Sequence, residues 1–139
     1  RLGADVQGFE GSEALVARAR SNAERNGLGA VPFAAADLYS DAFAARHLPK
    51  AEAVLLDPPR SGAEALCEDL ASTGARRVVY VSCNPKTLAR DAAALQRQGY
   101  TLEASGIMDM FPHTNHVESM ALFTVPAPPS GAEACRDEG

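Results

Sequence analysis

Apolar and polar positions follow two alternating periods along this chain, and the pattern predicts strands and helices in turn. Short apolar runs predict six strands, at 5–9, 31–35, 51–56, 78–81, 100–108 and 117–124. Helical spacing of apolar residues predicts helices over 12–27, 63–72 and 85–98. Strands that alternate with helices are typical of an α/β fold with a mostly parallel sheet. No clear helix separates the last two strands, so one of them is expected to run antiparallel.

Particular residues mark where these predicted helices and strands begin and end. Ser12 can cap the first helix with its hydroxyl, and Gly27 can end that helix, with Leu28 making a hydrophobic contact beyond it. The run 51–56 is almost unbroken in apolar residues, which is typical of a strand buried on both faces. It stops at Asp57-Pro58-Pro59, because proline cannot continue a strand ladder.

Length and composition indicate one globular domain followed by a tail. The chain has 139 residues, of which 46% are hydrophobic, enough for one core. We expect a folded part at 1–125 and a flexible tail at 126–139, where proline, glycine and acidic residues show no period. No apolar run approaches the roughly 20 residues that a membrane helix needs, so no membrane partner is expected.

Net charge and the number of cysteines exclude some classes of protein. The formal net charge of −5 argues against a self-sufficient nucleic-acid binder, because phosphate contacts need a basic face. A nucleic-acid partner would therefore need basic surface from elsewhere. The three cysteines are too scattered for a disulfide framework or a metal finger. A cytoplasmic location is expected.

Polar residues follow four of the predicted strands directly. Glu10, Asp37, Asp57 and Cys83 each come where such a strand ends. Ligands of open parallel sheets bind beyond the carboxyl ends of the strands, so these side chains are candidates for one binding edge. This placement is the main functional signal that the residues give by themselves.

Glu10 and Asp57 each have a functional and a structural interpretation. Glu10 could accept hydrogen bonds from two ribose hydroxyls, or it could be an exposed acid favoured near a helix N-terminus. No G-x-G-x-x-G motif is present, so either the nucleoside interpretation is wrong or the chain starts after such a loop. The two prolines fix the direction of the Asp57 carboxylate, which suits ligand binding, but the same sequence could be a structural turn.

Cys83 is the candidate nucleophile. It lies in Ser82-Cys83-Asn84-Pro85, where Pro85 leaves earlier N–H groups free and the helix dipole favours a thiolate. The competing interpretation is a buried, inert cysteine, which we keep for Cys67 and Cys135.

The segment 109–118 is dense in polar groups. Its His113 and His116 lack further paired ligands, so no metal is expected. Glu118 could be a general base or a solvated acid at the start of a strand.

Three motifs, taken in order, resemble one enzyme family. DPPRSG, VYVSCNPKTLARD and DMFPHTNHVESMALF together are similar to the RNA 5-methyluridine methyltransferases, and the resemblance spans about 6–125. It implies a Rossmann-like, S-adenosylmethionine-dependent methyltransferase fold, with a mostly parallel sheet and an antiparallel strand near the C-terminus. It also implies methylation of uridine C5 in ribosomal or transfer RNA, with the motif ending slightly closer to the ribosomal branch.

The resemblance also implies roles for individual residues. Cys83 would add to C6 of the uracil, and Glu118 would then remove the C5 proton. The cofactor S-adenosylmethionine would contact Glu10 through its ribose, together with Asp57 and Asp37. The uracil and nucleophile pocket would be shaped by Arg60, Asn84 and Pro85.

Some family parts are not in this sequence. They are the first strand with its glycine-rich loop, an upstream RNA-binding region, and the cysteine cluster that holds an iron–sulfur centre in some members. We therefore expect the C-terminal part of a longer enzyme, in which a central sheet position is missing and strand edges are unpaired. Such an isolated chain is expected to fold poorly or to bind cofactor weakly.

Three alternatives stay open. Cytosine-C5 methyltransferases use a cysteine after a similar strand, but they typically carry a second cysteine where this chain has Pro59-Arg60. A non-catalytic RNA-associated remnant is the second, and an amino-group methyltransferase, which has no need of Cys83, is the third. DNA is not an expected partner, and the sequence does not indicate an oligomeric state.

Overall fold

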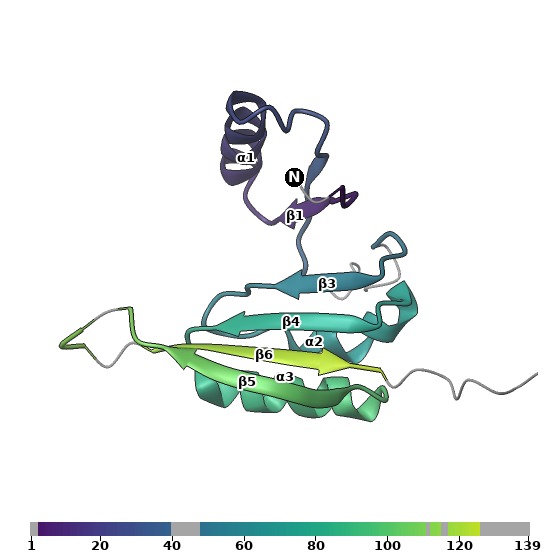
Figure 1. Ribbon diagram of the computed structural model, residues 1–139, viewed down its shortest axis with the longest axis vertical. Helices are drawn as coiled ribbons and strands as arrows, with labels where there is room; N and C mark the ends of the chain where they lie inside the picture. The colour runs from purple at the N-terminus through teal and green to yellow at the C-terminus, as the bar shows by residue number, and fades with distance from the viewer. Residues whose placement is uncertain (1–2, 40–47, 111, 115–116, 126–139) are drawn as a thin grey trace, which may run out of the picture.

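The computed structural model describes residues 3–39, 48–110, 112–114 and 117–125, and it has the predicted α/β architecture (Figure 1). Its elements, in chain order, are β1 (Gly8–Glu10), α1 (Glu13–Arg25), β2 (Phe33–Ala35), β3 (Ala53–Leu56), α2 (Glu64–Glu68), the short 3-10 helix η2 (Leu70–Thr73), β4 (Arg77–Ser82), α3 (Pro85–Arg97), β5 (Thr101–Met108) and β6 (Glu118–Thr124). Every predicted strand and helix is present, with ends that differ by a few residues.

The strands form two sheets rather than one. β1 and β2 pair in parallel, and a separate sheet has the order β3-β4-β6-β5. β3 and β4 are parallel, whereas β6 runs antiparallel to both β4 and β5. The expected antiparallel strand near the C-terminus is therefore β6. Among the described strands, β1, β2, β3 and β5 each lack a partner on one edge.

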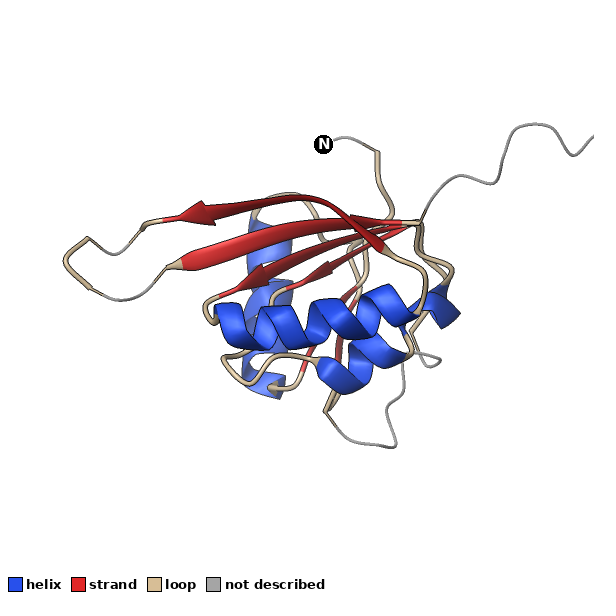
Figure 2. Cartoon of the chain, turned by 90° about the horizontal axis from the view of Figure 1, so that it is seen from below, coloured by secondary structure: helices blue, strands red, loops and turns tan. Residues whose placement is uncertain are grey.

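Both α2 and α3 cover one face of the four-stranded sheet (Figure 2). Against this face, the largest fully buried side chains are Tyr80, Phe123, Leu70, Leu95 and Val78. Burial of such apolar surface is the main stabilising contribution to the fold.

The opposite face of the four-stranded sheet is open. Leu55 is 69% exposed and Met120 is 38% exposed. The expectation that the strand at 51–56 is buried on both faces is therefore wrong, because in the described part of the chain the helices cover only one face. Leu56, on the helix-covered face, is 7% exposed.

Local capping explains where the long helices begin and end. The Ser12 hydroxyl accepts a hydrogen bond from the Leu15 N–H, as predicted. Gly27 has a φ of 68°, and the Leu28 N–H donates to the Ala23 carbonyl at 2.7 Å, which closes α1. Leu28 itself is 45% exposed, so the expected hydrophobic contact buries it only in part.

The predicted helix at 63–72 is broken into α2 and η2. Asp69, between them, has a φ of −124°, outside the helical range. Aspartate favours such positions because its side chain competes for backbone hydrogen bonds. Leu66 and Leu70 are still buried on the same core, so the interruption does not expose the apolar stripe.

Some sequence expectations fall outside the described residues. These are the tail at 126–139, with Cys135, and His116. Among the described helices, none is both long and apolar enough to cross a membrane.

Candidate functional site

The carboxyl ends of β3 and β4 lie at the same edge of the four-stranded sheet (Figure 1). Asp57 follows the last residue of β3, and Cys83 follows the last residue of β4. Because β6 runs in the opposite direction, its first residue, Glu118, lies at this edge too. Antiparallel pairing thus brings together residues that are 35 positions apart in the sequence.

Strand pairing brings Cys83 and Glu118 to the same edge of the sheet. Ser82 pairs with Ser119, and Cys83 and Glu118 are the residues next to this pair. Cys83 lies in the bend that follows β4, and Glu118, the first residue of β6, pairs with Met108 of β5. The sequence interpretation put Cys83 at the end of one strand and Glu118 at the start of another, but it did not predict that these two strands are neighbours.

Alternation along the strands also fixes the face. Ser82, Ser119 and Leu56 are buried on the helix-covered side of the sheet. The residues that follow or precede them in an extended strand point to the other side. Glu118, which precedes Ser119 in β6, is therefore assigned to the open face, and Asp57 and Cys83 lie in the turns that follow β3 and β4 at the same edge.

The two described cysteines differ in the way the sequence predicted. Cys67 is fully buried within α2, and burial raises the pKa of its thiol to about 12. Cys83 is a free thiol that is partly exposed. A thiolate is the reactive form of cysteine, so Cys67 is inert near neutral pH.

We expect iodoacetamide at pH 8 to alkylate Cys83 in the folded protein and to leave Cys67 unmodified. With a pKa of about 12, Cys67 has a thiolate fraction of roughly 10⁻⁴ at this pH. Peptide mass spectrometry on a Cys135→Ala background measures both sites, and a denatured sample controls for labelling efficiency. Equal labelling of both sites in the folded protein would contradict this assignment.

The turn after β4 is held by its own side chains. The Asn84 N–H donates to the Ser82 hydroxyl at 3.1 Å, and Asn84 Oδ1 accepts from the Lys86 N–H at 3.1 Å. Pro85 occupies the first turn of α3, as predicted. The expectation of free N–H groups before Pro85 is wrong for Asn84, because the Ser82 hydroxyl accepts a hydrogen bond from its N–H.

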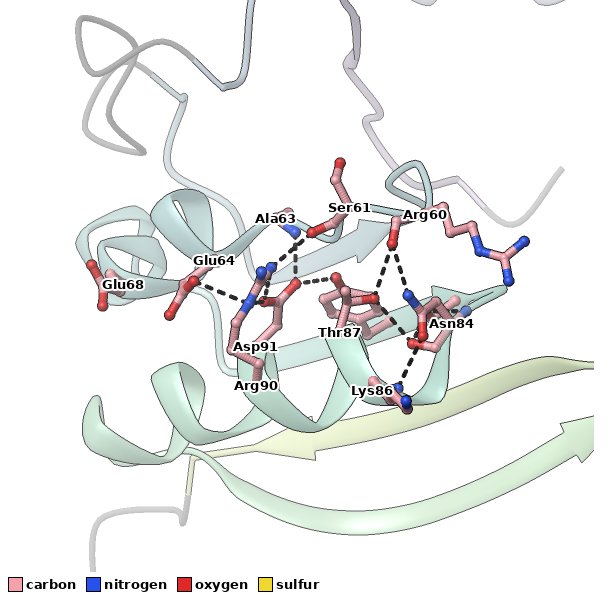
Figure 3. Close-up of polar contacts among 12 residues, drawn as sticks. Arg60, Ser61, Ala63, Glu64, Glu68, Asn84, Lys86, Thr87, Arg90 and Asp91 are labelled. Atoms are coloured by element: carbon pink, nitrogen blue, oxygen red, sulfur yellow. Dashed lines mark hydrogen bonds and ion pairs between the residues drawn. The ribbon is translucent and has the colours of Figure 1, made fainter.

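The turn after β3 is fastened to the start of α3 (Figure 3). The Arg60 carbonyl accepts hydrogen bonds from Asn84 Nδ2 at 3.1 Å and from the Thr87 hydroxyl at 3.3 Å. The Arg60 side chain is exposed and extends away from these contacts. The predicted pocket residues Arg60 and Asn84 are thus brought together, and their contact is made by the Arg60 backbone.

A buried carboxylate that sequence reasoning missed lies behind this contact. Asp91 is 0% exposed, and it accepts hydrogen bonds from the Ala63 N–H at 2.6 Å and from the Tyr80 hydroxyl. Arg90 pairs with its other oxygen at 2.7 Å. The signal was present in the sequence, since Asp91 lies three residues after Leu88 and four before Leu95, on the apolar stripe of α3. Burial, followed by the hydrogen bond to Asp91, raises the pKa of Tyr80, so its hydroxyl stays a donor.

Glu10 is the last residue of β1, and Asp37 comes two residues after β2, which pairs with β1. Both are exposed, with Glu10 Oε1 accepting from the Ser12 N–H at 2.9 Å and Asp37 Oδ1 from the Tyr39 N–H at 3.0 Å. Burial raises the pKa of Tyr39; a hydrogen bond with Ser61 opposes this shift, and the charges of Asp91, Glu10 and Asp37 add to it. Tyr39 and Ser61 line the same hollow, so the segment after β2 lies near the loop that follows Asp57.

These carboxylates fit a nucleoside with a positively charged group. No described residue donates to Glu10 Oε2 or to the Asp57 carboxylate, so these oxygens are available to ribose hydroxyls or to a cation. Two hollows, of about 450 and 420 Å³, are lined by none of the predicted site residues. The carboxylates of Glu10, Asp37 and Asp57 are exposed to solvent.

No group of three or more potential metal ligands occurs in the described ranges. His113 lies in the loop between β5 and β6 with a φ of 66°.

Comparison with known proteins agrees with this geometry. The family model described as "tRNA (Uracil-5-)-methyltransferase" matches residues 12–125. The 23S rRNA (uracil(1939)-C(5))-methyltransferase RlmD of Hahella chejuensis is 58% identical over 128 residues, which are 88% of this chain and 29% of that protein. The RlmD of Pseudomonas aeruginosa is 59% identical over 124 residues, or 86% of this chain and 27% of that protein. The chain thus spans less than a third of the length of these relatives.

Similarity to solved structures identifies the fold. The tRNA (uracil-54, C5)-methyltransferase of Pyrococcus abyssi, in complex with S-adenosyl-L-homocysteine, is similar with a TM-score of 0.74 and 35% identity, over 88% of this chain and 29% of that one. The magnesium protoporphyrin IX methyltransferase of Synechocystis, with bound SAM, gives a TM-score of 0.67 at 23% identity, over 89% of this chain and 61% of that one, and shows the fold alone. The fold is that of Rossmann-like, S-adenosylmethionine-dependent methyltransferases. On the match of residues 12–125, the chain belongs to the tRNA (uracil-5-)-methyltransferase family.

Proposed function

We propose that this chain is the C-terminal catalytic part of an S-adenosylmethionine-dependent RNA methyltransferase that acts on C5 of uridine. The observation that carries the proposal is the pairing of β4 with β3 and β6, which brings the end of β3 before Asp57, the end of β4 before Cys83 and the start of β6 at Glu118 to one edge of the sheet. The catalytic part would be residues 1–125, with 126–139 as a flexible tail. We call this chain together with an upstream region, like that of its longer relatives, the intact enzyme.

The pairing of a thiol with a carboxylate suits a two-stage covalent reaction. Cys83 Sγ adds to C6 of the uracil, and the electron pair of the C5–C6 double bond moves toward C5 and the C4 carbonyl. C5 then takes the methyl group that S-adenosylmethionine supplies when bound. Glu118 removes the C5 proton, the C5–C6 double bond re-forms, and the Cys83 thiolate leaves.

The positions of the two residues support this assignment of steps. Cys83 bonds to C6 while Glu118 must reach the proton on the adjacent carbon, so the two groups must lie within a few ångströms of one uracil ring. Pairing of β4 with β6 brings the residue after β4 and the first residue of β6 to the same edge. The hydrogen bond from the Asn84 N–H to the Ser82 hydroxyl holds the turn that carries Cys83.

The acidic edge supports the cofactor assignment. Glu10 would hold the ribose hydroxyls, with Asp37 and Asp57 as further contacts. Tyr39 and Ser61 line one hollow, so the segments that follow β2 and β3 lie near one another, as a single ligand requires. The solved tRNA (uracil-54, C5)-methyltransferase in complex with S-adenosyl-L-homocysteine, 35% identical to this chain, supports the same cofactor.

The substrate is proposed to be ribosomal RNA, because the most similar of the reported relatives are named as 23S rRNA enzymes. Arg60, Asn84 and Pro85 would border the uracil. The net charge of −5 leaves most phosphate contacts to the upstream region, where an iron–sulfur centre would also lie if this enzyme has one. A cytoplasmic location follows from this substrate.

The test is to identify the methylated base. The intact enzyme is incubated with a 23S rRNA transcript and methyl-labelled S-adenosylmethionine, and the nucleosides are separated by liquid chromatography with mass detection. The proposal expects 5-methyluridine. Label in 5-methylcytidine would favour the cytosine alternative, label in an exocyclic amine would favour an amino-group enzyme, and no label would favour a non-catalytic remnant.

Glu10→Ala should weaken binding of S-adenosyl-L-homocysteine to the intact enzyme. Loss of a charge-assisted hydrogen bond costs about 1.5–3 kcal/mol, or roughly tenfold to a hundredfold in Kd. Isothermal titration calorimetry measures the effect.

Two further variants serve as controls for Glu10→Ala. Glu10→Gln keeps an oxygen for the Ser12 N–H and removes the charge, so a similar loss assigns the effect to the carboxylate. Glu24→Ala removes an exposed acid from α1, away from the edge, and should leave Kd unchanged. An unaltered Kd in both Glu10 variants would remove Glu10 from the site.

A further inference from the structure

One face of α3 fastens the loop at 60–63, which follows the Asp57 turn. Asn84, Thr87 and Asp91 are spaced by three and then four residues, which places them on the same side of a helix. Asn84 and Thr87 bond to the Arg60 carbonyl, and Asp91 bonds to the Ala63 N–H. Arg90 adds a hydrogen bond from Nη2 to the Ser61 carbonyl at 2.8 Å.

Asp91 is the centre of these contacts (Figure 3). Its Oδ2 accepts from the Ala63 N–H and from the Tyr80 hydroxyl, and its Oδ1 pairs with Arg90 Nε at 2.9 Å. One buried carboxylate thus joins the loop after β3, strand β4 and helix α3. A buried charge is stable only when such partners surround it, so the carboxylate holds all three elements in one arrangement.

At Gly62, the loop lies so close to α3 that there is no room for a side chain. It has a φ of 78°, and a Cβ atom at this position would lie 2.5 Å from Asp91 Oδ2 and 2.6 Å from Arg90 Nη2. The loop therefore approaches α3 as closely as a residue without a side chain allows.

We propose that Asp91 is a positioning residue that sets the separation between the Asp57 turn and Cys83 by fixing the 60–63 loop against α3. The inference rests on the proposed function, in which Asp57 contacts the cofactor and Cys83 holds the uracil. Asp91 touches neither. α3 begins two residues after Cys83, and the loop begins three residues after Asp57, so a shift between loop and helix moves the two turns relative to one another.

The expected effect is on the rate of methyl transfer at saturating substrates. The methyl group and C5 must meet in a defined geometry, and a displacement of about 1 Å can lower a rate by roughly a hundredfold. A role in stability alone would lower the melting temperature and leave kcat of the folded enzyme unchanged.

Two glycines with the same backbone geometry provide the test. Gly62 and Gly74 have φ values of 78° and 80°, and no heavy atom lies within 4 Å of a Cβ built on Gly74. Alanine at either position carries the same backbone strain, so the comparison isolates the close approach of the loop to α3, where the added Cβ meets Asp91, Arg90 and Thr87. In the intact enzyme, Gly62→Ala should lower kcat by about ten- to a hundredfold relative to Gly74→Ala.

A second pair of variants decides the question if Gly62→Ala does not fold. Tyr80 and Tyr100 are both buried, and each donates one hydrogen bond from its hydroxyl, to Asp91 and to the Ala75 carbonyl respectively. Tyr80→Phe should lower kcat by about threefold or more relative to Tyr100→Phe, at temperatures where circular dichroism shows both folded.

The measurements are kcat and KM for RNA and for S-adenosylmethionine, together with the melting temperature. A kcat within twofold of the control, in the Gly62/Gly74 pair or in the tyrosine pair where Gly62→Ala is unfolded, would overturn the role of Asp91. An intact wild-type enzyme that makes no 5-methyluridine would instead overturn the proposed function, so the two failures are distinguishable.

Discussion

Cys83→Ala should abolish uridine methylation by the intact enzyme and also its covalent complex with RNA that carries 5-fluorouridine. The addition to C6 needs a thiolate, and no described group near the edge replaces it, so activity should fall by about 10⁴-fold or more. In the wild type, 5-fluorouridine traps the adduct, because fluorine at C5 cannot leave as the proton does. Denaturing electrophoresis detects the complex, and mass spectrometry of the digested adduct locates the bond.

The other cysteines are the matched controls for this experiment. Cys67→Ala and Cys135→Ala should both retain methylation and the adduct. Cys67 is fully buried, so Cys67→Ala is expected to cost some stability, and its activity is compared below its melting temperature. Methylation that survives in Cys83→Ala, or an adduct located on Cys67, would contradict the assignment of the nucleophile.

Glu118→Gln should fail at a later step than Cys83→Ala. Glutamine keeps the size of the side chain and loses the base, so Cys83 still adds and the methyl group still transfers. The C5 proton then remains, and elimination of the cysteine stalls. Turnover should fall by about 10²–10⁴-fold. The expected species is a methylated RNA–protein adduct that persists through denaturing electrophoresis and carries label from the cofactor.

The three outcomes for Glu118→Gln have different meanings. A labelled adduct that accumulates supports the role of Glu118 as the base. Near-normal turnover without a trapped species would mean a solvated acid at the start of β6. Loss of both turnover and adduct would mean that Glu118 positions the uracil or supports the fold. Glu103→Gln, an exposed acid on the neighbouring strand β5, is the matched control and should behave as the wild type.

Several features follow from short-range patterns, which explains why the sequence predicts them. Ser12 caps α1 because a hydroxyl at that position reaches a free N–H three residues on, whatever the rest of the chain does. β3 ends before Asp57 because two prolines follow it. Cys67 is buried because it lies on the apolar stripe of a helix.

Other features depend on which strands become neighbours, which no local pattern states. β6 lies between β4 and β5 and runs against both, although β5 precedes it in the chain. This order brings the start of β6, with Glu118, next to the end of β4, which Cys83 follows. The exposure of Leu55 has the same origin, because an apolar run does not tell how many faces of its strand are covered.

By itself, the sequence determined the α/β class, most elements and a set of chemically suited residues, since these depend on periodicity and on motifs. Tertiary structure decided which of those residues meet. It brought Cys83 and Glu118 to one edge through the pairing of β4 with β6, split the strands into two sheets, and gave Asp91 its donors from three elements. The physical reason is that register and burial are set by contacts between segments distant in sequence, and their free energy is not contained in any one segment.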